Sequence, residues 1–208
     1  ADRIDLKTGR PVETAAARAL DGVVDIYPSS AGLHSWQRMA MSPRTGLVYV
    51  PTMQMSTRFF RGQPEDDEVF VGGLTIGEGK AQPGDNKGAL VAWDPVKQQQ
   101  RWSAPLDTVW NGGVAATAGD VVFMGAGDGW FSAYDARSGA RLWRAYAGMG
   151  IIAAPTVWSA GGRQYVSVLA GYGGSAGMFD AMKVGWKYSG PRRLLTFALD
   201  GKAVLPES

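Results

Sequence analysis

An eleven-residue repeat constrains the fold of this chain more than any other feature of its sequence. Residues 133–143 (AYDARSGARLW) begin 41 residues after residues 92–102 (AWDPVKQQQRW), and each copy has Asp at its third position and Trp at its eleventh. Shorter copies of the same turn occur at 5–9 and 198–201. A period of about 40 to 45 residues, enough for four short strands, is typical of one β-propeller blade. The 208 residues therefore predict an all-β propeller with about four blades.

The residue types in the repeat fit a tight turn followed by contact with a neighbouring blade. Asp opens such a turn, and Gly supplies the positive φ that the turn requires. Trp then offers a large flat surface that can lie on the next blade. The first copy has Gln98 where the second copy has Gly139, so we expect the first turn to be different or looser.

The rest of the chain alternates short apolar runs with turn residues, as a propeller requires. Glycine (29 residues) and proline (11 residues) are frequent and separate the predicted strands. These strands are 46–51, 88–94, 120–125, 129–135, 154–158, 163–170 and 194–201. Two stretches, 58–82 and 171–190, are predicted as long excursions. We expect one propeller domain over 1–202, followed by the start of a linker or tail at 203–208.

Composition excludes several classes of protein and of site. The chain has no cysteine and one histidine, which excludes disulfides, thiolate metal sites and haem attachment through Cys-x-x-Cys-His, and no metal ligands are predicted. The net charge of +2, without a basic run, argues against nucleic-acid binding. No stretch approaches the roughly 18 consecutive apolar residues of a membrane helix, so no membrane span is expected. The first residues lack Met and an apolar signal segment, which predicts an internal or processed terminus.

Five segments, in the order of the family, resemble the pyrroloquinoline quinone (PQQ)-dependent alcohol dehydrogenases. They are 32–37 (GLHSWQ), 42–51 (SPRTGLVYVP), 110–119 (WNGGVAATAG), the repeat ending at Trp143, and 148–155 continuing to 164–166 and 171–174. The resemblance covers nearly the whole chain. It implies about four blades from the C-terminal half of an eight-bladed quinoprotein propeller. The ending 193–202 (RLLTFALDGK) is similar to the point at which quinohaemoprotein members leave the propeller for a cytochrome c domain.

The resemblance also implies where the chemistry lies. The catalytic Asp of the family, its Ca²⁺ ligands, a disulfide over the quinone and the Trp beneath the quinone belong to the N-terminal half of the propeller. No catalytic residue is therefore expected in this chain, and PQQ and Ca²⁺ would be bound together with that half, supplied by a second chain or a cleaved segment. Further implications are a cytochrome c electron acceptor, a small-molecule alcohol substrate, a haem c in a separate domain and a periplasmic location.

Five residues are predicted to frame this cofactor, which is a planar quinone with three carboxylates. Ser35 and Trp36 stand where the family commonly has Asn-Trp at the quinone edge, and Trp110 precedes glycines that allow close backbone approach. Ile151 and Ile152 begin a strand whose backbone N–H groups could hold a carboxylate. Each prediction has a structural alternative: Trp36 and Trp110 as tryptophans between blades, and 150–153 as an ordinary buried strand.

The function implied by the resemblance is oxidation of a primary or secondary alcohol to an aldehyde or ketone, with electrons passed to a haem or cytochrome acceptor. In that case this chain frames the cofactor and the substrate mouth. The alternative is a non-catalytic β-propeller binding scaffold built from the same repeats. A third possibility is a quinoprotein that acts on an unusual hydroxyl compound, such as a polymer, sugar or toxin alcohol.

Overall fold

The computed structural model describes residues 1–15, 17, 22–62, 69–71, 74–79, 82–173 and 190–205. These residues form seventeen β-strands joined by turns and loops. The chain divides into two compact units: unit 1 comprises 1–32 and 55–85, and unit 2 comprises 33–54 and 86–208. Within the described residues there is no helix long and apolar enough to cross a membrane.

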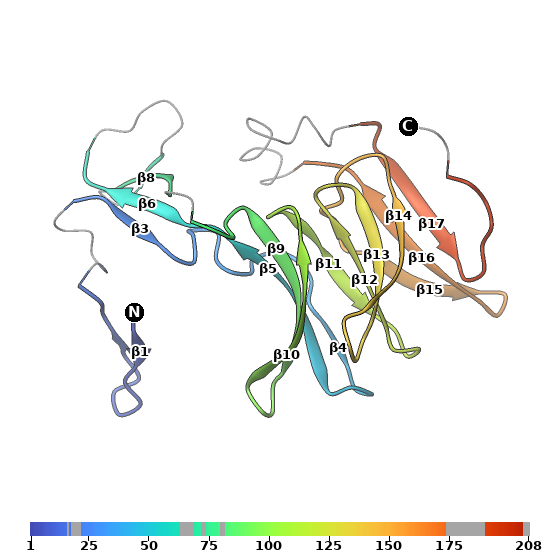
Figure 1. The fold of residues 1–208 in the computed structure, drawn as a ribbon, viewed down its shortest axis with the longest axis horizontal. Coiled ribbons are helices and arrows are strands. Elements are labelled where there is room, and N and C mark those ends of the chain that lie inside the picture. The colour runs from blue at the N-terminus through green and yellow to red at the C-terminus, as the bar shows by residue number, and fades with distance from the viewer. Residues whose placement is uncertain are drawn as a thin grey trace. The chain divides into compact units, whose positions relative to one another are not determined.

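Unit 2 consists of three antiparallel sheets that follow one another along the chain (Figure 1). The first sheet has the order β4 (Ala40–Ser42), β5 (Leu47–Gln54), β9 (Lys87–Asp94) and β10 (Gln99–Leu106). The second has the order β11 (Asn111–Ala116), β12 (Val121–Ala126), β13 (Trp130–Asp135) and β14 (Arg141–Tyr146). The third has the order β15 (Thr156–Ala160), β16 (Arg163–Ala170) and β17 (Arg193–Ala198). These sheets are the first, second and third blades, so the predicted all-β propeller is confirmed.

Unit 1 contains a two-stranded hairpin and a four-stranded sheet. The hairpin pairs β1 (Arg3–Ile4) with β2 (Pro11–Val12), and the sheet has the order β3 (Val24–Ile26), β6 (Thr57–Phe60), β8 (Leu74–Glu78) and β7 (Val69–Val71). The stretch 58–82, which the sequence predicts as an excursion, thus contains strands of its own. It lies between β5 and β9, which pair with each other directly, so it is inserted into a hairpin of the first blade. Of the other predictions, residues 174–189 of the excursion at 171–190 and residues 206–208 of the tail lie outside the described residues.

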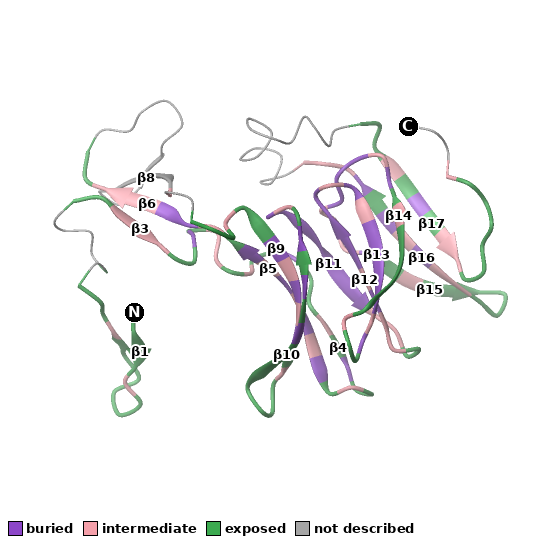
Figure 2. Cartoon of the chain, in the orientation of Figure 1, coloured by how far each residue is buried: buried purple, intermediate pink, exposed green. Residues whose placement is uncertain are grey.

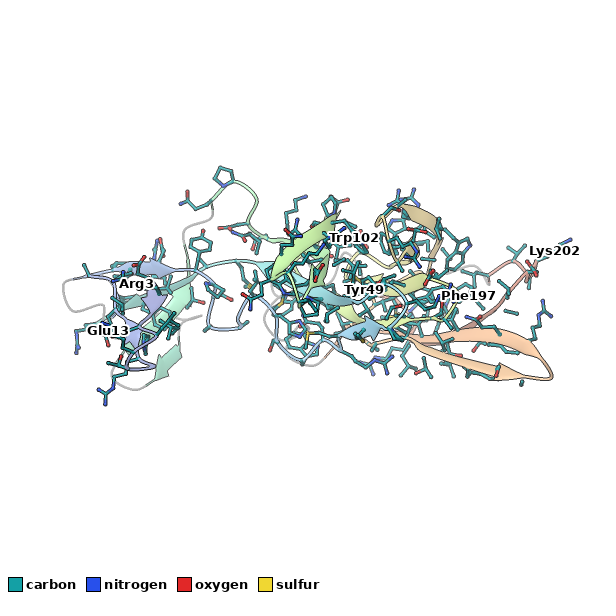
Figure 3. All side chains as sticks on the ribbon, turned by 90° about the horizontal axis from the view of Figure 1, so that it is seen from below. Arg3, Glu13, Tyr49, Trp102, Phe197 and Lys202 are labelled. Carbon is teal, nitrogen blue, oxygen red and sulfur yellow. The ribbon has the colours of Figure 1, made fainter. Side chains whose placement is uncertain are left out.

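Contact between the first and second blades runs through the repeat. The indole of Trp102 in β10 is only 9% exposed and donates its Nε1–H to the carbonyl oxygen of Ala136 at 3.1 Å. The hydroxyl of Tyr49 in β5 donates to the same carbonyl at 3.0 Å, and its ring lies 5.8 Å from that of Trp102 (Figure 3). A Cβ on Gly139 would lie 2.5 Å from Cε3 of Trp102, so glycine lets the indole lie flat on this turn. The Trp of the first copy therefore lies on the turn of the second copy.

The turns of the two copies share several features. The carboxylates of Asp94 and Asp135 each accept hydrogen bonds from the backbone N–H groups of the residues two and three positions later. The backbone bonds lower the pKa of Asp94, and the Ser138 hydroxyl followed by the backbone bonds lowers that of Asp135. Gln98 has a φ of 52° and Gly139 one of 74°, so both occupy the left-handed region. The second turn also has a backbone bond from the N–H of Gly139 to the carbonyl of Asp135 at 2.9 Å. The prediction that the first turn is different or looser therefore stays a prediction.

Two apolar cores hold the three blades together (Figure 2). The first core joins the first and second blades and includes Tyr49, Leu90, Val114, Val122 and Met124. The second core joins the second and third blades and includes Phe131, Ile151, Val166, Val168 and Leu195. Trp143, the Trp of the second copy, lies beside the second core, edge-on to Phe131 and Phe197, and remains 40% exposed. The second copy therefore buries its Trp much less than the first.

Candidate functional site

Two glycines in β11 allow three segments of unit 2 to come together. A Cβ on Gly112 would lie 2.7 Å from the carbonyl oxygen of Ala153, and a Cβ on Gly113 would lie 2.6 Å from the backbone nitrogen of Arg38. Val114 donates its N–H to the carbonyl of Arg38 at 2.8 Å, and the Arg38 side chain donates to the carbonyl of Val114 at 3.3 Å. The close approach that the glycines predict is therefore an approach to neighbouring backbone.

Trp36 and Trp110, which lie far apart in the sequence, are brought together near these glycines. Their ring centroids are 5.3 Å apart, and the ring planes are inclined by 27°, which is a stacked arrangement. Trp110 is 4% exposed, whereas Trp36 is 47% exposed. The buried indole therefore supports the exposed one and leaves part of the Trp36 surface free to contact a ligand.

Asn111 fixes the position of Trp110, and it was not predicted as a site residue. Its side chain is fully buried, and Nδ2 donates to the carbonyl oxygens of Thr52 at 3.0 Å and of Val109 at 3.2 Å. The buried Oδ1 has no hydrogen-bond partner among the described residues. The carbonyl of Trp110 itself accepts from the N–H of Gly127 at 2.9 Å. These bonds tie the start of β11 to β5 and to the turn after β12. The one signal in the sequence is the position of Asn111 between Trp110 and the two glycines.

Ile151 and Ile152 have different environments. Ile151 is fully buried, packs against Gly125, where a Cβ would collide with it, and donates its N–H to the carbonyl of Ala126 at 2.9 Å. This N–H is therefore already used, so the role of carboxylate donor predicted for it is not available to Ile151. Ile152 is half-buried and lines a pocket. The pair thus divides into a supporting residue and a lining residue.

The pocket beside Trp36 has a volume of about 540 Å³ and lies within unit 2. Gly171 forms a parallel bridge with Ile151 and donates its N–H to the carbonyl of Gly150, which joins the segment that contains Ile152 to the segment that contains Tyr172. The ring of Tyr172 lies so close to Gly150 that no side chain would fit there. Tyr172 and Arg192 were not predicted as site residues, although both border a glycine-rich stretch that contains aromatic residues. The lining consists of Trp36, Ile152, Ala153, Gly171, Tyr172, Gly173 and Arg192.

Ser35 adjoins the pocket but is not among its lining residues. Ser35 is exposed, and its N–H donates to the side-chain oxygen of Gln37 at 3.1 Å. Gln37 is buried and donates Nε2–H to the sulfur of Met53 at 3.3 Å. His34 contacts the carbonyl of Pro51 through Nδ1 at 2.7 Å. The turn that carries Trp36 is therefore anchored to the core on both sides of the indole.

The charge at the pocket is positive. Arg192 is the one charged side chain among its described lining residues. In the described part of the chain, no three His, Asp or Glu side chains gather in a group that could hold a metal ion. The site offers flat aromatic and apolar surfaces together with a guanidinium, and this combination suits a planar anionic ligand.

Comparison with known proteins identifies the family. Residues 79–166 match the PQQ family described as the glucose/ethanol/alcohol dehydrogenase β-propeller domain. Quinohemoprotein alcohol dehydrogenase ADH IIB of Pseudomonas putida is 42% identical over 99% of this chain and 30% of its own length. The chain belongs to the PQQ-dependent alcohol dehydrogenases. This confirms the resemblance to that family which the sequence motifs indicate.

Solved structures similar to this PQQ-family chain agree with its fold. Quinohemoprotein alcohol dehydrogenase from Comamonas testosteroni superposes with a TM-score of 0.81 at 35% identity, over 97% of this chain and 31% of that one. A europium-containing methanol dehydrogenase superposes with a TM-score of 0.76 at 29% identity, over 94% of this chain and 38% of that one. The PQQ-family chain spans about 30% of the length of the curated relatives that it matches.

Proposed function

We propose that this chain is part of a PQQ-dependent alcohol dehydrogenase and frames its cofactor and substrate mouth. The observation that carries the proposal is the pocket beside Trp36, whose exposed indole is supported by Trp110 and adjoins Ile152. A planar quinone with three carboxylates requires flat apolar surfaces and positive charge, and the described lining residues offer both. The residues at the pocket therefore fit PQQ.

Each of the predicted residues has a defined task in this proposal. Trp36 offers its indole surface to the ring system of the cofactor, and Ile152 contacts the cofactor from the pocket wall. Trp110 and Ser35 hold Trp36 in its orientation, and Ile151 supports Ile152 from the core. When bound, PQQ supplies the two-electron oxidation of the alcohol.

The groups that act on the alcohol are proposed to lie outside this chain. An N-terminal half of the propeller, as a second chain or a cleaved segment, would supply the catalytic Asp and the Ca²⁺ ligands. A primary or secondary alcohol would leave as an aldehyde or ketone, and the electrons would pass to a haem c domain or a separate cytochrome c in the periplasm. The quinohemoprotein names of the relatives support a haem acceptor.

Binding of PQQ in the presence of Ca²⁺ by the complete enzyme, in which this chain is combined with the N-terminal half of the propeller, tests this proposal. We expect Trp36→Ala to weaken PQQ binding by about tenfold or more, because the variant loses an aromatic surface against the quinone. The melting temperature should change little, since the indole is about half exposed. Trp93→Ala is the matched control: Trp93 is 39% exposed and is not among the lining residues of the pocket. Equilibrium dialysis with absorbance detection of PQQ gives the affinities.

Three results are distinguishable. A loss of affinity confined to Trp36→Ala supports the proposed role. Equal PQQ affinities in the wild type and in both variants contradict the role of Trp36. A complete wild-type protein, with the N-terminal half present, that neither binds PQQ nor reduces a dye with added PQQ and Ca²⁺ favours the non-catalytic scaffold.

A further inference from the structure

Arg192 supplies the positive charge of the pocket, but the function proposed above does not say which group of a ligand it binds. It directly precedes β17 and shares the pocket with Trp36 and Tyr172. A Cβ on Gly171 would lie 3.8 Å from Cγ of Arg192, so the aliphatic part of this side chain passes close to Gly171. Gly171 forms a parallel β-bridge with Ile151, which is fully buried. The aliphatic part of Arg192 therefore lies near Gly171, whose backbone is hydrogen-bonded to Gly150.

The surroundings of this guanidinium favour an anionic ligand. The other lining residues that the structure describes are aromatic, aliphatic or glycine, and none of them carries a charge. Arg192 is exposed, so its guanidinium is accessible to a ligand that enters the pocket from solvent. The planar guanidinium of Arg also matches a carboxylate with two parallel N–H groups.

Trp36 and Arg192 together define the shape of the ligand. A flat ring can stack on the exposed indole, and a carboxylate can pair with the guanidinium that lines the same pocket. An aliphatic acid would leave the indole without a partner ring, and a neutral aromatic compound would leave the guanidinium without an anion. The pair therefore selects planar aromatic carboxylates.

We propose that Arg192 binds a carboxylate of a planar ligand in this pocket. The inference rests on the proposed function, because PQQ itself is such a ligand. The same chemistry has a second source, an alcohol substrate that carries a carboxylate. With the first source Arg192 is a cofactor-binding residue, and with the second it determines substrate specificity.

The first experiment measures the carboxylate site without the quinone. The probe is benzene-1,3,5-tricarboxylate, a planar tricarboxylate, titrated into the purified protein and followed by ligand-detected NMR. A charge-assisted hydrogen bond contributes about 1.5–3 kcal/mol, so Arg192→Leu should weaken binding by roughly 10- to 100-fold, and Arg192→Lys by less. Arg101→Leu is the matched control, because it removes the same charge from an exposed position on β10 that is outside the pocket.

Two further measurements, made on the complete enzyme that includes the N-terminal half, distinguish the sources of the carboxylate. If the cofactor supplies it, Arg192→Leu weakens PQQ binding by about tenfold or more and leaves the ratio of KM values for a carboxylated and a neutral alcohol unchanged. If the substrate supplies it, PQQ affinity is unchanged and KM rises for the carboxylated alcohol alone. Both results support a carboxylate site at Arg192.

The proposal is overturned if the wild type does not bind the tricarboxylate, or if wild type and Arg192→Leu have equal affinities for tricarboxylate and PQQ and equal KM ratios. Failure of the proposed function gives a different pattern. In that case the wild type would bind the tricarboxylate in a manner that depends on Arg192, but would not bind PQQ.

Discussion

At the scale of single residues, two carboxylates of the second blade have opposite effects on stability. Burial raises the pKa of Asp128, in the turn between β12 and β13, and the charge of Asp107 raises it further. The hydroxyl and N–H of Ser138 lower the pKa of Asp135. The charged form of Asp128 is therefore disfavoured in the folded state, whereas that of Asp135 is favoured.

We predict that Asp128→Asn raises the melting temperature at pH 7, because the variant removes a charge that the fold destabilises and keeps an oxygen to accept the N–H of Trp130. The pKa of Asp128 is higher in the folded than in the unfolded chain, so the wild type gains stability as the pH falls through the folded pKa. The advantage of the variant should shrink as the pH approaches 3.8, the ordinary value for Asp. Thermal melts between pH 4 and pH 8 measure this.

Asp135→Asn is the control of opposite sign. It should lower the melting temperature at pH 7, because a hydrogen-bonded charge is lost, and this penalty should also fade toward low pH. A constant difference across the pH range for either variant would show that its ionisation is not responsible.

At the scale of strands and turns, the two tryptophans of the repeat form a matched pair. Trp102 is 9% exposed and hydrogen-bonded to the next turn, whereas Trp143 is 40% exposed. We predict that Trp102→Ala lowers the free energy of unfolding by about 3–5 kcal/mol, the usual range for a large buried aromatic residue. Trp143→Ala should cost clearly less. Urea denaturation measures both values, and equal losses would contradict the unequal burial of the two indoles.

The elements that could be predicted from the sequence are those whose pattern is local. The repeat and the apolar runs located β5, β9, β12, β13, β15, β16 and β17 to within a few residues. β11, with its run Asn-Gly-Gly-Val-Ala-Ala, was not predicted, because glycine and alanine carry little strand signal without the neighbours that bury them. The strands β7 and β8 lie in a stretch that has the composition of a loop.

The site was predictable only in part, for a related reason. Trp36 and Trp110 were found through family motifs, and their contact required the fold. Whether the N–H of Ile151 was free depended on its partner Ala126, which no local pattern reveals. Arg192 belongs to the site because Trp36 and Ile152, which are distant from it in the sequence, line the same pocket.

At the scale of the whole chain, the division into two units predicts that unit 2 can fold without unit 1. Gln54 pairs directly with Lys87, and Asn86 donates its N–H to the carbonyl of Gln54 at 2.9 Å, so the insertion leaves and re-enters the first blade at one point. A variant that begins at Leu33 and joins Gln54 to Lys87 through Asn-Gly, a favoured two-residue hairpin turn, should keep the β-sheet circular dichroism signal of unit 2 and unfold cooperatively.

The control for this variant uses the same start and a flexible Gly-Ser linker of ten residues in place of Asn-Gly. If both variants fail to fold, unit 1 is required for the blades, and the prediction is contradicted. If only the tight turn fails, the closure geometry is at fault and the units are still independent.

The carbonyl of Ala136, which accepts from both Tyr49 and Trp102, has an evolutionary consequence. A main-chain oxygen is present whatever residue is encoded, so mutation cannot delete this acceptor. Selection then needs to maintain only the donors and enough room above the turn. The two copies of the repeat differ at most turn positions, yet both retain the tryptophan. Substitutions in the turn are therefore compatible with an unchanged contact between the blades, provided that the tryptophan is kept.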